Sequence, residues 1–302
     1  MTKSPGGSLW VAREAPGSPW LLARRLTAEG GIKQADLELL LDAAQWGKTV
    51  THPKVARLVF AAILEGELGL VGDYHEGEPL RSLLRLAAFR TKPVPAPVAL
   101  RITLDVLDAL SHLASSAPAA ARGCRYATGG LLPDQVLVGT DGVTRLLEPG
   151  VVAAQTVVSK LERVADVAGY RAPEQLVRLG HFEPSVDVFA VGVMLWEMVT
   201  GKRLFAGASY DVVVKRVSSE PIMRLDNVRP QGGEVIPQAV ADLVFRALDR
   251  NPSSRFATAT DMASAIQSSA REIATAQQVT DFVVEVLDKG LKVRQRTLER
   301  AS

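Results

Sequence analysis

One stretch of this chain limits its fold more than any other: residues 186–200 are almost entirely apolar and are followed by Gly201. Asp187 and Glu197 are the charged residues within it. The stretch is too short to cross a bilayer, which takes about 20 apolar residues. A helix that is apolar on all sides has to be surrounded by the other elements of a sizeable domain. The sequence therefore predicts a buried central helix that ends at Gly201, a residue type suited to closing helices.

Composition limits the functions open to the chain. Its 302 residues are enough for two packed lobes, and 47% hydrophobic and 23% charged residues are ordinary for a globular protein. A net charge of +2 is too small to predict binding to nucleic acid or to a membrane surface. The first residues contain no apolar core of signal-peptide length, and Cys124 is the only cysteine, so no internal disulfide can form. We expect a cytoplasmic protein without a membrane span.

Metal ligation by histidine and cysteine is not expected. Zinc and similar ions are held by such side chains at short, regular spacings. The four histidines share no such spacing with one another or with Cys124; they are His52, His75, His112 and His181.

Hydrophobic periodicity divides the chain into two unequal parts. Before about residue 75, apolar runs predict strands at 8–13, 20–26, 55–63 and 68–74, with a helix at 34–46. After Pro79 the pattern is mostly helical, apart from two short strands at 135–138 and 144–147. Helices are expected at 98–115, 186–200, 211–218, 238–249, 261–276 and 281–299. The predicted fold class is α+β in three parts: a small lobe of antiparallel sheet plus one helix at 1–75, a larger, mostly helical lobe at 76–276, and a C-terminal amphipathic helix within 277–302.

Three ordered motifs in the second part resemble the large lobe of a protein kinase. They are Tyr170-Arg171-Ala172-Pro173-Glu174, the helix segment 185–193, and the segment 247–255, which ends at Arg255. These motifs are most similar to those of bacterial Ser/Thr kinases. The resemblance covers nearly the whole chain to about residue 270. It implies the two-lobed kinase fold. It also implies two structural features: a buried ion pair between Glu174 and Arg255, and a brace from Asp187 to the catalytic-loop backbone.

The positions that carry kinase chemistry depart from the family pattern. A kinase catalytic loop has the form H-R-D-L-x-x-x-N, in which Asp accepts the substrate proton and Asn holds Mg²⁺. The matching residues 128–135 place Gly130 at the base position and Gln135 at the Asn position. Glu148 stands at the metal-binding Asp of the D-F-G motif, and Pro149 follows it. Glutamate is one methylene longer than aspartate, and Mg²⁺ tolerates little change in ligand geometry.

The small lobe departs from the pattern as well. Residues 4–12 resemble the second half of a glycine-rich loop, with a first strand that is short or missing. Arg25 stands where a kinase has its phosphate-pairing lysine, and a planar guanidinium is not a conservative replacement for an ammonium group. Asp42, rather than Glu38, is the better match to the helix glutamate that pairs with that lysine. Arg25 and Asp42 either form an ion pair or are two separate surface charges.

These departures together predict that the chain is not an enzyme. The resemblance implies a catalytically inactive pseudokinase without a cofactor, which acts in signalling as an interaction or scaffold module for a protein partner such as another kinase. Two alternatives stay open. The chain could bind a nucleotide without transferring phosphate, through Arg25, Asp42 and the hinge-like residues Asp73 and His75, or it could be a weak atypical Ser/Thr kinase. The oligomeric state is not predicted.

Two segments are candidates for partner contact. Residues 151–168 occupy the activation-segment position and are unusually apolar, so they either pack against the lobe or form a docking patch. Thr156 and Ser159 within them carry hydroxyl groups that another kinase could modify. The C-terminal helix is expected to pack on the large lobe with a solvated basic face, and the alternative is an arm that binds an acidic partner or a membrane surface.

Overall fold

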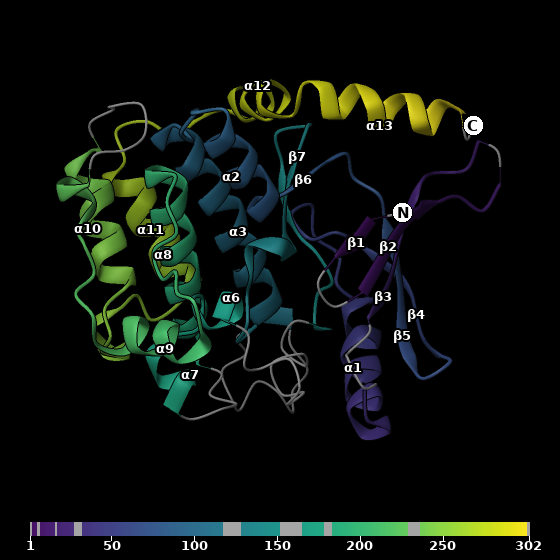
Figure 1. Cartoon of the computed structure of the whole chain (residues 1–302), viewed down its shortest axis with the longest axis horizontal. Coiled ribbons are helices and arrows are strands. Elements are labelled where there is room, and N and C mark those ends of the chain that lie inside the picture. Colours follow the sequence, from purple (N-terminus) through teal and green to yellow (C-terminus); the bar gives the residue numbers. More distant parts are fainter. Residues whose placement is uncertain are drawn as a thin grey trace.

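The computed structural model describes residues 2–4, 7–15, 17–26, 32–116, 128–151, 165–177, 183–228 and 236–300. These residues form two lobes side by side, a smaller one built around a sheet and a larger one built mostly from helices (Figure 1). The predicted two-lobed α+β architecture is confirmed.

The small lobe contains a five-stranded antiparallel sheet in the order β1-β2-β3-β5-β4. The strands are β1 (Thr2–Ser4), β2 (Gly7–Ala12), β3 (Leu21–Leu26), β4 (Leu58–Leu64) and β5 (Glu67–Asp73). Side chains alternate between the two faces of a strand. Leu26 pairs with Leu68 in the register of β3 and β5, and both lie with Leu70 in the buried core on the inner face of the sheet.

Helix α1 (Gln34–Gly47) covers that inner face. Its buried residues Leu37, Leu40 and Ala44 recur at helical spacing and pack with the strands into a core separate from that of the large lobe. Val151, from the segment after Glu148, is fully buried in the same core. The small-lobe helix is therefore tied by packing to the segment that follows the predicted metal position.

The strand predicted at 55–63 begins only at Leu58, because the residues before it bond to the large lobe instead. Ala56 N donates to Leu146 O at 2.8 Å, and Leu146 N donates to Lys54 O at 2.9 Å. The Lys54 ammonium lies 2.9 Å from a carboxylate oxygen of Asp105 and 2.9 Å from one of Asp108. Residues 54–56 thus form a tether between the lobes.

A stacked histidine pair adds a titratable group to this tether. The rings of His52 and His112 lie 4.6 Å apart, and burial, His112 and Lys54 lower the pKa of His52 while Asp108 opposes them. A pKa below the unfolded value of about 6.5 means that protonation favours the unfolded chain. The stabilising contribution of neutral His52 should therefore be fully present above about pH 6.5 and be lost as the pH falls toward the lower folded pKa.

The measurement is urea unfolding at pH 7.5 and pH 5.5 for the natural chain and for His52→Gln. The natural chain should lose more unfolding free energy between these two pH values than the variant loses. Equal losses would show that His52 has no part in the acid response.

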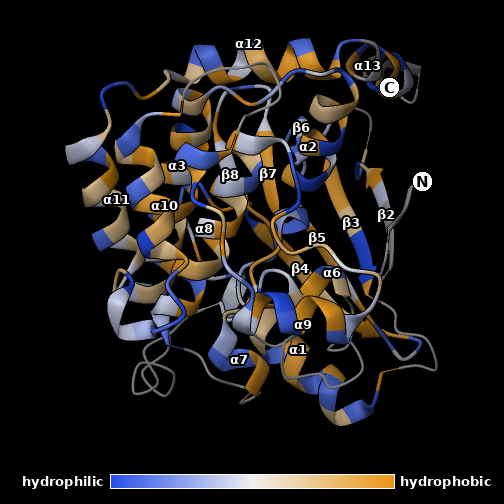
Figure 2. Ribbon diagram, turned by 60° about the vertical axis from the view of Figure 1, so that its left-hand side comes forward, coloured by the Kyte–Doolittle hydropathy of each residue, from blue (hydrophilic) through white to orange (hydrophobic). Residues whose placement is uncertain are grey.

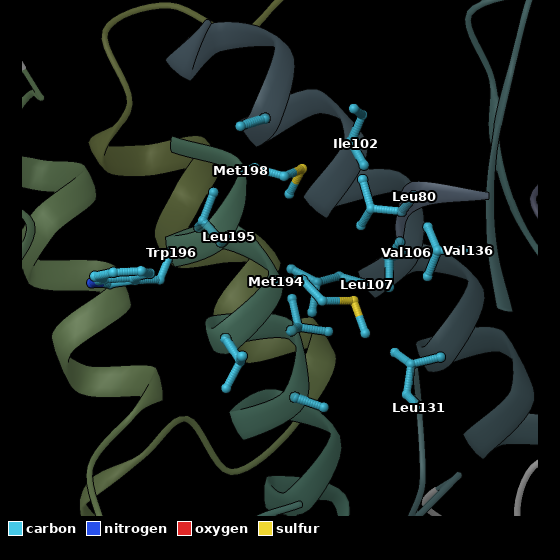
Figure 3. Close-up of a cluster of buried hydrophobic side chains, with 14 of the residues drawn as sticks. Leu80, Ile102, Val106, Leu107, Leu131, Val136, Met194, Leu195, Trp196 and Met198 are labelled. Carbon is cyan, nitrogen blue, oxygen red and sulfur yellow. The ribbon is translucent and has the colours of Figure 1, made fainter. Parts of the chain in front are cut away.

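Helix α8 (Pro184–Thr200) is the predicted central helix, and every residue from Ser185 to Thr200 is buried. Figure 3 shows Met194 and Met198 pointing toward the neighbouring side chains of α3 (Ala96–Ser116), with Trp196 on the opposite side of α8. Gly201 closes the helix at a left-handed φ of 67°, as the sequence predicts. Like every other helix in the described ranges, α8 is not long and apolar enough to cross a membrane.

The other elements of the large lobe surround α8, and Figure 2 shows hydrophobic residues gathered in this interior. A second sheet, in the order β6-β7-β8, lies beside the small lobe and consists of β6 (Gly77–Pro79), β7 (Val136–Gly139) and β8 (Thr144–Leu146). The helices are α2 (Leu80–Phe89), α6 (Ala165–Ala168), α7 (Pro173–Val177), α9 (Tyr210–Ser219), α10 (Gln238–Ala247) and α11 (Ala259–Ser269). Short 3-10 turns lie at Pro133–Gln135, Leu225–Asn227 and Pro252–Ser254.

The single C-terminal helix predicted at 281–299 is two helices, α12 (Ala276–Leu287) and α13 (Lys289–Arg300). The break is at Asp288, whose φ is 26°. Helix α12 packs on the large lobe, while Arg294 of α13 donates to Gly77 O at 2.8 Å and pairs with Glu78. Figure 1 shows α13 continuing from the large lobe toward the small lobe.

Deleting residues 277–302 is expected to destabilise the large lobe. The deletion removes the buried side chains of Val279, Phe282, Val283, Val286 and Leu287. At about 1.5–3 kcal/mol for each buried side chain, and with some chain entropy regained, the loss should be on the order of 5 kcal/mol. Thermal unfolding and light scattering would measure it. A deletion of 289–302 alone is the control and should cost much less, and equal stability of the two truncated chains would contradict the packing role of α12.

Candidate functional site

The loop at residues 128–135 is held from two sides by buried side chains. Asp187 of α8 accepts hydrogen bonds from Thr128 N at 2.6 Å, Thr128 Oγ1 at 2.6 Å and Gly129 N at 3.1 Å. Gln175 of α7 donates to Gly129 O at 2.6 Å. Burial raises the pKa of Asp187 to about 6, although its hydrogen bonds with Thr128 and Gly129 oppose the rise. The structure thus places Asp187 as the brace that the kinase resemblance implies.

The end of this loop has no charged side chain at the positions expected to do chemistry. Gly130 is half-buried and has no side chain. Gln135 is buried, and its side-chain oxygen accepts a hydrogen bond from Leu132 N at 2.9 Å. Asp134 is paired with Arg81 of α2 at 2.6 Å. Gln135 therefore stabilises the turn of its own loop.

Glu174 and Arg255 form a bidentate ion pair beneath this loop. The two guanidinium nitrogens of Arg255 lie 2.7 Å and 2.8 Å from the two carboxylate oxygens of Glu174. The Arg255 side chain has no exposed surface, and it also donates to Asp249 O at 2.6 Å and to Ser185 O at 3.2 Å. One buried arginine therefore joins α7, the start of α8 and the segment after α10.

Arg24 of β3 in the small lobe forms an ion pair with Glu148, which follows β8 of the large lobe. The Arg24 guanidinium nitrogen Nη1 lies 2.8 Å and 2.7 Å from the two carboxylate oxygens. The two side chains are 22% and 12% exposed, so most of this pair is shielded from water. Arg24 and Leu26 are two residues apart and share the inner face of β3.

This geometry corrects the assignment of Arg25 as the cation of the site. Arg25 points to the opposite face of β3, where its Nε donates to Glu67 at 2.6 Å and its guanidinium also lies 3.7 Å from Glu65. Asp42 is exposed on α1, so of the two alternatives for Arg25 and Asp42 the structure shows the separate surface charges and not the ion pair. Strand side chains alternate, and a one-residue difference in register moves a side chain to the other face. The burial of Leu26 in the small-lobe core places Arg24, two residues before it, on the inner face.

The hinge-like residues are engaged in other contacts. Asp73 binds Arg57 through both carboxylate oxygens, at 2.9 Å and 3.0 Å, and Asp73 N donates to Arg57 O. Burial, with Arg145 nearby, lowers the pKa of His75. The nucleotide contact expected of these residues is through backbone groups, and it remains a prediction.

Arg24 and Glu148 are the residues that fit a nucleotide and its Mg²⁺, because guanidinium groups bind phosphate and carboxylates bind Mg²⁺. Gln135 does not fit as a second ligand while its oxygen bonds Leu132 N. Within the described ranges, no group of three or more His, Cys, Asp or Glu side chains is placed to hold a metal ion. The donor set therefore suits phosphate binding with one carboxylate toward Mg²⁺.

A second network near the loop was not predicted from the sequence. The Tyr170 hydroxyl donates to Glu197 Oε2 at 2.6 Å, and the guanidinium groups of Arg81 and Arg203 lie 5.4 Å and 5.2 Å from the Tyr170 ring centroid. Burial raises the pKa of both Tyr170 and Glu197. Glu197, a charge in an otherwise apolar helix, was the sequence signal for such a partner. Cys124, His181, Thr156 and Ser159, with most of residues 151–168, lie outside the described residues.

Comparison with known proteins assigns the chain to a family. Residues 27–268 match the protein kinase domain family. The chain is 31% identical over 210 residues to serine/threonine-protein kinase PknL of Mycobacterium tuberculosis, covering 68% of this chain and 48% of the relative. It is 30% identical over 251 residues to serine/threonine-protein kinase PksC of Streptomyces coelicolor (79% and 42%) and 25% identical over 234 residues to tyrosine-protein kinase MasK of Myxococcus xanthus (76% and 35%). The chain spans less than half the length of these relatives.

These findings contradict the expectation that the chain is not an enzyme, because the relatives are named as protein kinases. The expectation gave too much weight to the missing base at Gly130. Phosphoryl transfer depends mainly on positioning and electrostatic stabilisation rather than on one base. With a family match over well more than half of its length, the chain belongs to the protein kinase family.

Proposed function

We propose that this chain carries out slow Ser/Thr-type phosphoryl transfer to a protein substrate. The observation that carries the proposal is the meeting of Arg24 and Glu148 between the lobes, next to a catalytic loop braced by Asp187. The named activity of PknL and PksC supports the reaction class. The structural frame is complete enough to hold the loop in one conformation, since Glu174 and Arg255 anchor the segment beside it.

In this proposal some residues position the reacting groups and others supply charge. Arg24 would hold the phosphates, and Glu148 would be the carboxylate available to Mg²⁺, which when bound would neutralise charge on the transferring group. The transition state of this reaction is loose, so the attacking hydroxyl need not lose its proton early. With no side chain at Gly130, the proton passes to water or to a phosphate oxygen. A positioned base contributes ~10²–10⁴ in rate, and we expect this chain to be slower than an ordinary kinase by about that factor.

The direct test is transfer of radiolabelled γ-phosphate to the chain itself and to a panel of protein substrates, with saturating Mg²⁺ or Mn²⁺. Transfer above the buffer control is expected, and Glu148→Ala should abolish it. Glu67→Ala is the matched control, because it removes a carboxylate that pairs with Arg25 on the outer face of the sheet. If the natural chain shows no transfer under any of these conditions, the proposal is wrong.

We infer a signalling role that also involves a protein partner, such as another kinase. Helix α13 supports this, because Lys292, Val293 and Arg296 are exposed on it, Val293 at 63%. A basic helix face with an exposed apolar residue suits an acidic protein surface. Pull-down from native extract should recover a partner that the double variant Lys292→Glu/Arg296→Glu no longer binds. Equal recovery by both proteins would place the partner surface elsewhere.

A further inference from the structure

Helices α12 and α13 lie outside the segment that matches the protein kinase family. That match covers residues 27–268, whereas the two helices span Ala276–Leu287 and Lys289–Arg300. Leu291, near the start of α13, is buried in the large-lobe core, and Figure 1 shows the helix continuing from there toward the small lobe. The contacts that α13 makes are therefore an addition to the kinase frame and not a part of it.

One side chain of α13, that of Arg294, fastens the helix to the segment that joins the lobes. Its guanidinium nitrogen Nη1 donates to Gly77 O at 2.8 Å, and Nη2 pairs with the carboxylate of Glu78. The Glu78 side chain is only 10% exposed, so this carboxylate is largely shielded from water. Burial raises the pKa of the Tyr74 hydroxyl, and Arg294 opposes the rise. Arg294 is thus bound directly after the hinge-like residues 73–75 and lies close to the tyrosine among them.

The break between α12 and α13 gives α13 a second arrangement, which its local sequence favours. Asp288 has a φ of 26°, and a residue with a side chain is held at a positive φ only by its surroundings. Hydrophobic periodicity predicts one uninterrupted helix over 281–299 instead. Leu287 and Leu291 are buried on either side of the break, and Arg294 is anchored one turn beyond. If Arg294 leaves its partners, the backbone at Asp288 can relax toward the straight helix.

The exposed side of α13 carries positive charge with little acid to balance it. Residues 289–302 contain five Lys or Arg residues and one Glu. Lys292 and Arg296 are exposed, and the Arg294 side chain between them in the sequence is itself 43% exposed. An acidic surface that meets this face gains by charge complementarity. In the docked helix Glu78 already supplies Arg294 with the carboxylate that such a surface would bring.

We propose that α13 is a strap across the lobe junction that an acidic protein segment releases, with Glu78 as the internal competitor for Arg294. In the docked state Glu78 compensates the charge of Arg294. The released state offers the partner one more uncompensated cation, so the partner binds that state more tightly and shifts the population toward it. Gly77 and Glu78 then lose their tie to the C-terminal helix, and the two lobes are freer to change their angle. The proposal rests on the partner role of α13 in the proposed function.

The binding test uses a labelled polyglutamate peptide as the acidic probe and measures its affinity for the full chain by fluorescence anisotropy. Glu78→Gln removes the internal competitor and should tighten binding by about fivefold or more, the lower end of the range usual for coupled sites. Glu285→Gln is the matched control, because it also frees one cation, Lys92, but does so on α12, and it should leave the affinity nearly unchanged. The gain should disappear in the double variant Glu78→Gln/Arg294→Gln.

Hydrogen exchange followed by mass spectrometry tests the release itself. Saturating polyglutamate should speed exchange in residues 73–79 of the natural chain. Without the peptide, Asp288→Ala should exchange faster there than Asp288→Gly, because alanine favours an uninterrupted helix and glycine favours a break. The two residue types differ by about fivefold in helix equilibrium, and the exchange rates should differ by a similar factor.

Three results would each overturn the strap. They are an equal gain in affinity in Glu285→Gln and Glu78→Gln, unchanged exchange in residues 73–79 when polyglutamate binds, and no binding of the peptide by any of the proteins. A native extract that yields no partner for α13, while the peptide binds and releases the helix as expected, would instead remove the partner role in the proposed function and leave the strap in place.

Discussion

Replacing Arg255 with alanine is expected to lower the unfolding free energy by about 3–5 kcal/mol. The Arg255 side chain is fully shielded from solvent and holds both carboxylate oxygens of Glu174. Its removal leaves the Glu174 carboxylate, itself 17% exposed, without a counter-charge, and also leaves Asp249 O and Ser185 O without their donor. A buried charge without a partner costs far more than a surface ion pair contributes.

Urea unfolding followed by circular dichroism would measure the loss. Arg224→Ala is the control, since Arg224 pairs with Asp226 and Asp242 on an exposed surface and should leave the midpoint nearly unchanged. Arg255→Lys should retain only part of the stability, because an ammonium group cannot make the bidentate contact. Unfolding of Arg255→Ala at the natural midpoint would show that this pair does not hold the large lobe together.

The Glu174–Arg255 pair could be predicted from the sequence, although 81 residues separate its members. Both lie in the motifs that resemble protein kinases, and it is that resemblance which implied the pair. The burial of the central helix could also be predicted, because an apolar run of this length is stable only in the interior of a domain. Asp187 within it needed a buried partner, and the backbone of residues 128–129 supplies one.

Arg24 could not be separated from Arg25 with the same certainty. The β3 sequence Leu21-Leu22-Ala23-Arg24-Arg25-Leu26 does not alternate between apolar and polar residues. All but Leu26 are partly exposed, so hydrophobicity alone does not fix which face turns inward. The inner face is decided by tertiary contacts, namely the burial of Leu26 and the position of Glu148.

The break at Asp288 is also a tertiary effect. The apolar spacing of α12 follows the surface of the large lobe, whereas α13 turns to bring Arg294 to Gly77 and Glu78 at the junction of the lobes. The apolar spacing within the helix does not reveal that Arg294 contacts Gly77 and Glu78. Local periodicity therefore predicted one helix where the protein has two.

Placing aspartate at residue 130 is expected to raise the phosphoryl-transfer rate by ~10²–10⁴, the contribution of a positioned general base. Gly130 is half-buried, and the left-handed φ of 64° in this loop belongs to its neighbour Gly129. Asp187 and Gln175 already fix the backbone on which the new carboxylate would stand. The gain should therefore need no rearrangement of the loop.

Gly130→Asn is the matched control, because it has nearly the same shape as the aspartate variant but cannot accept a proton at neutral pH. Single-turnover transfer of radiolabelled phosphate should be accelerated in Gly130→Asp alone, and Glu148→Ala should remove the gain when combined with it. Equal rates for the aspartate and asparagine variants would mean that the added side chain changes packing and not proton transfer. If both variants instead transfer phosphate at the rate of the natural chain, the missing base does not limit the reaction. The limit would then lie with Gln135, which is bound to Leu132, and with Arg24 and Glu148, which are bound to each other.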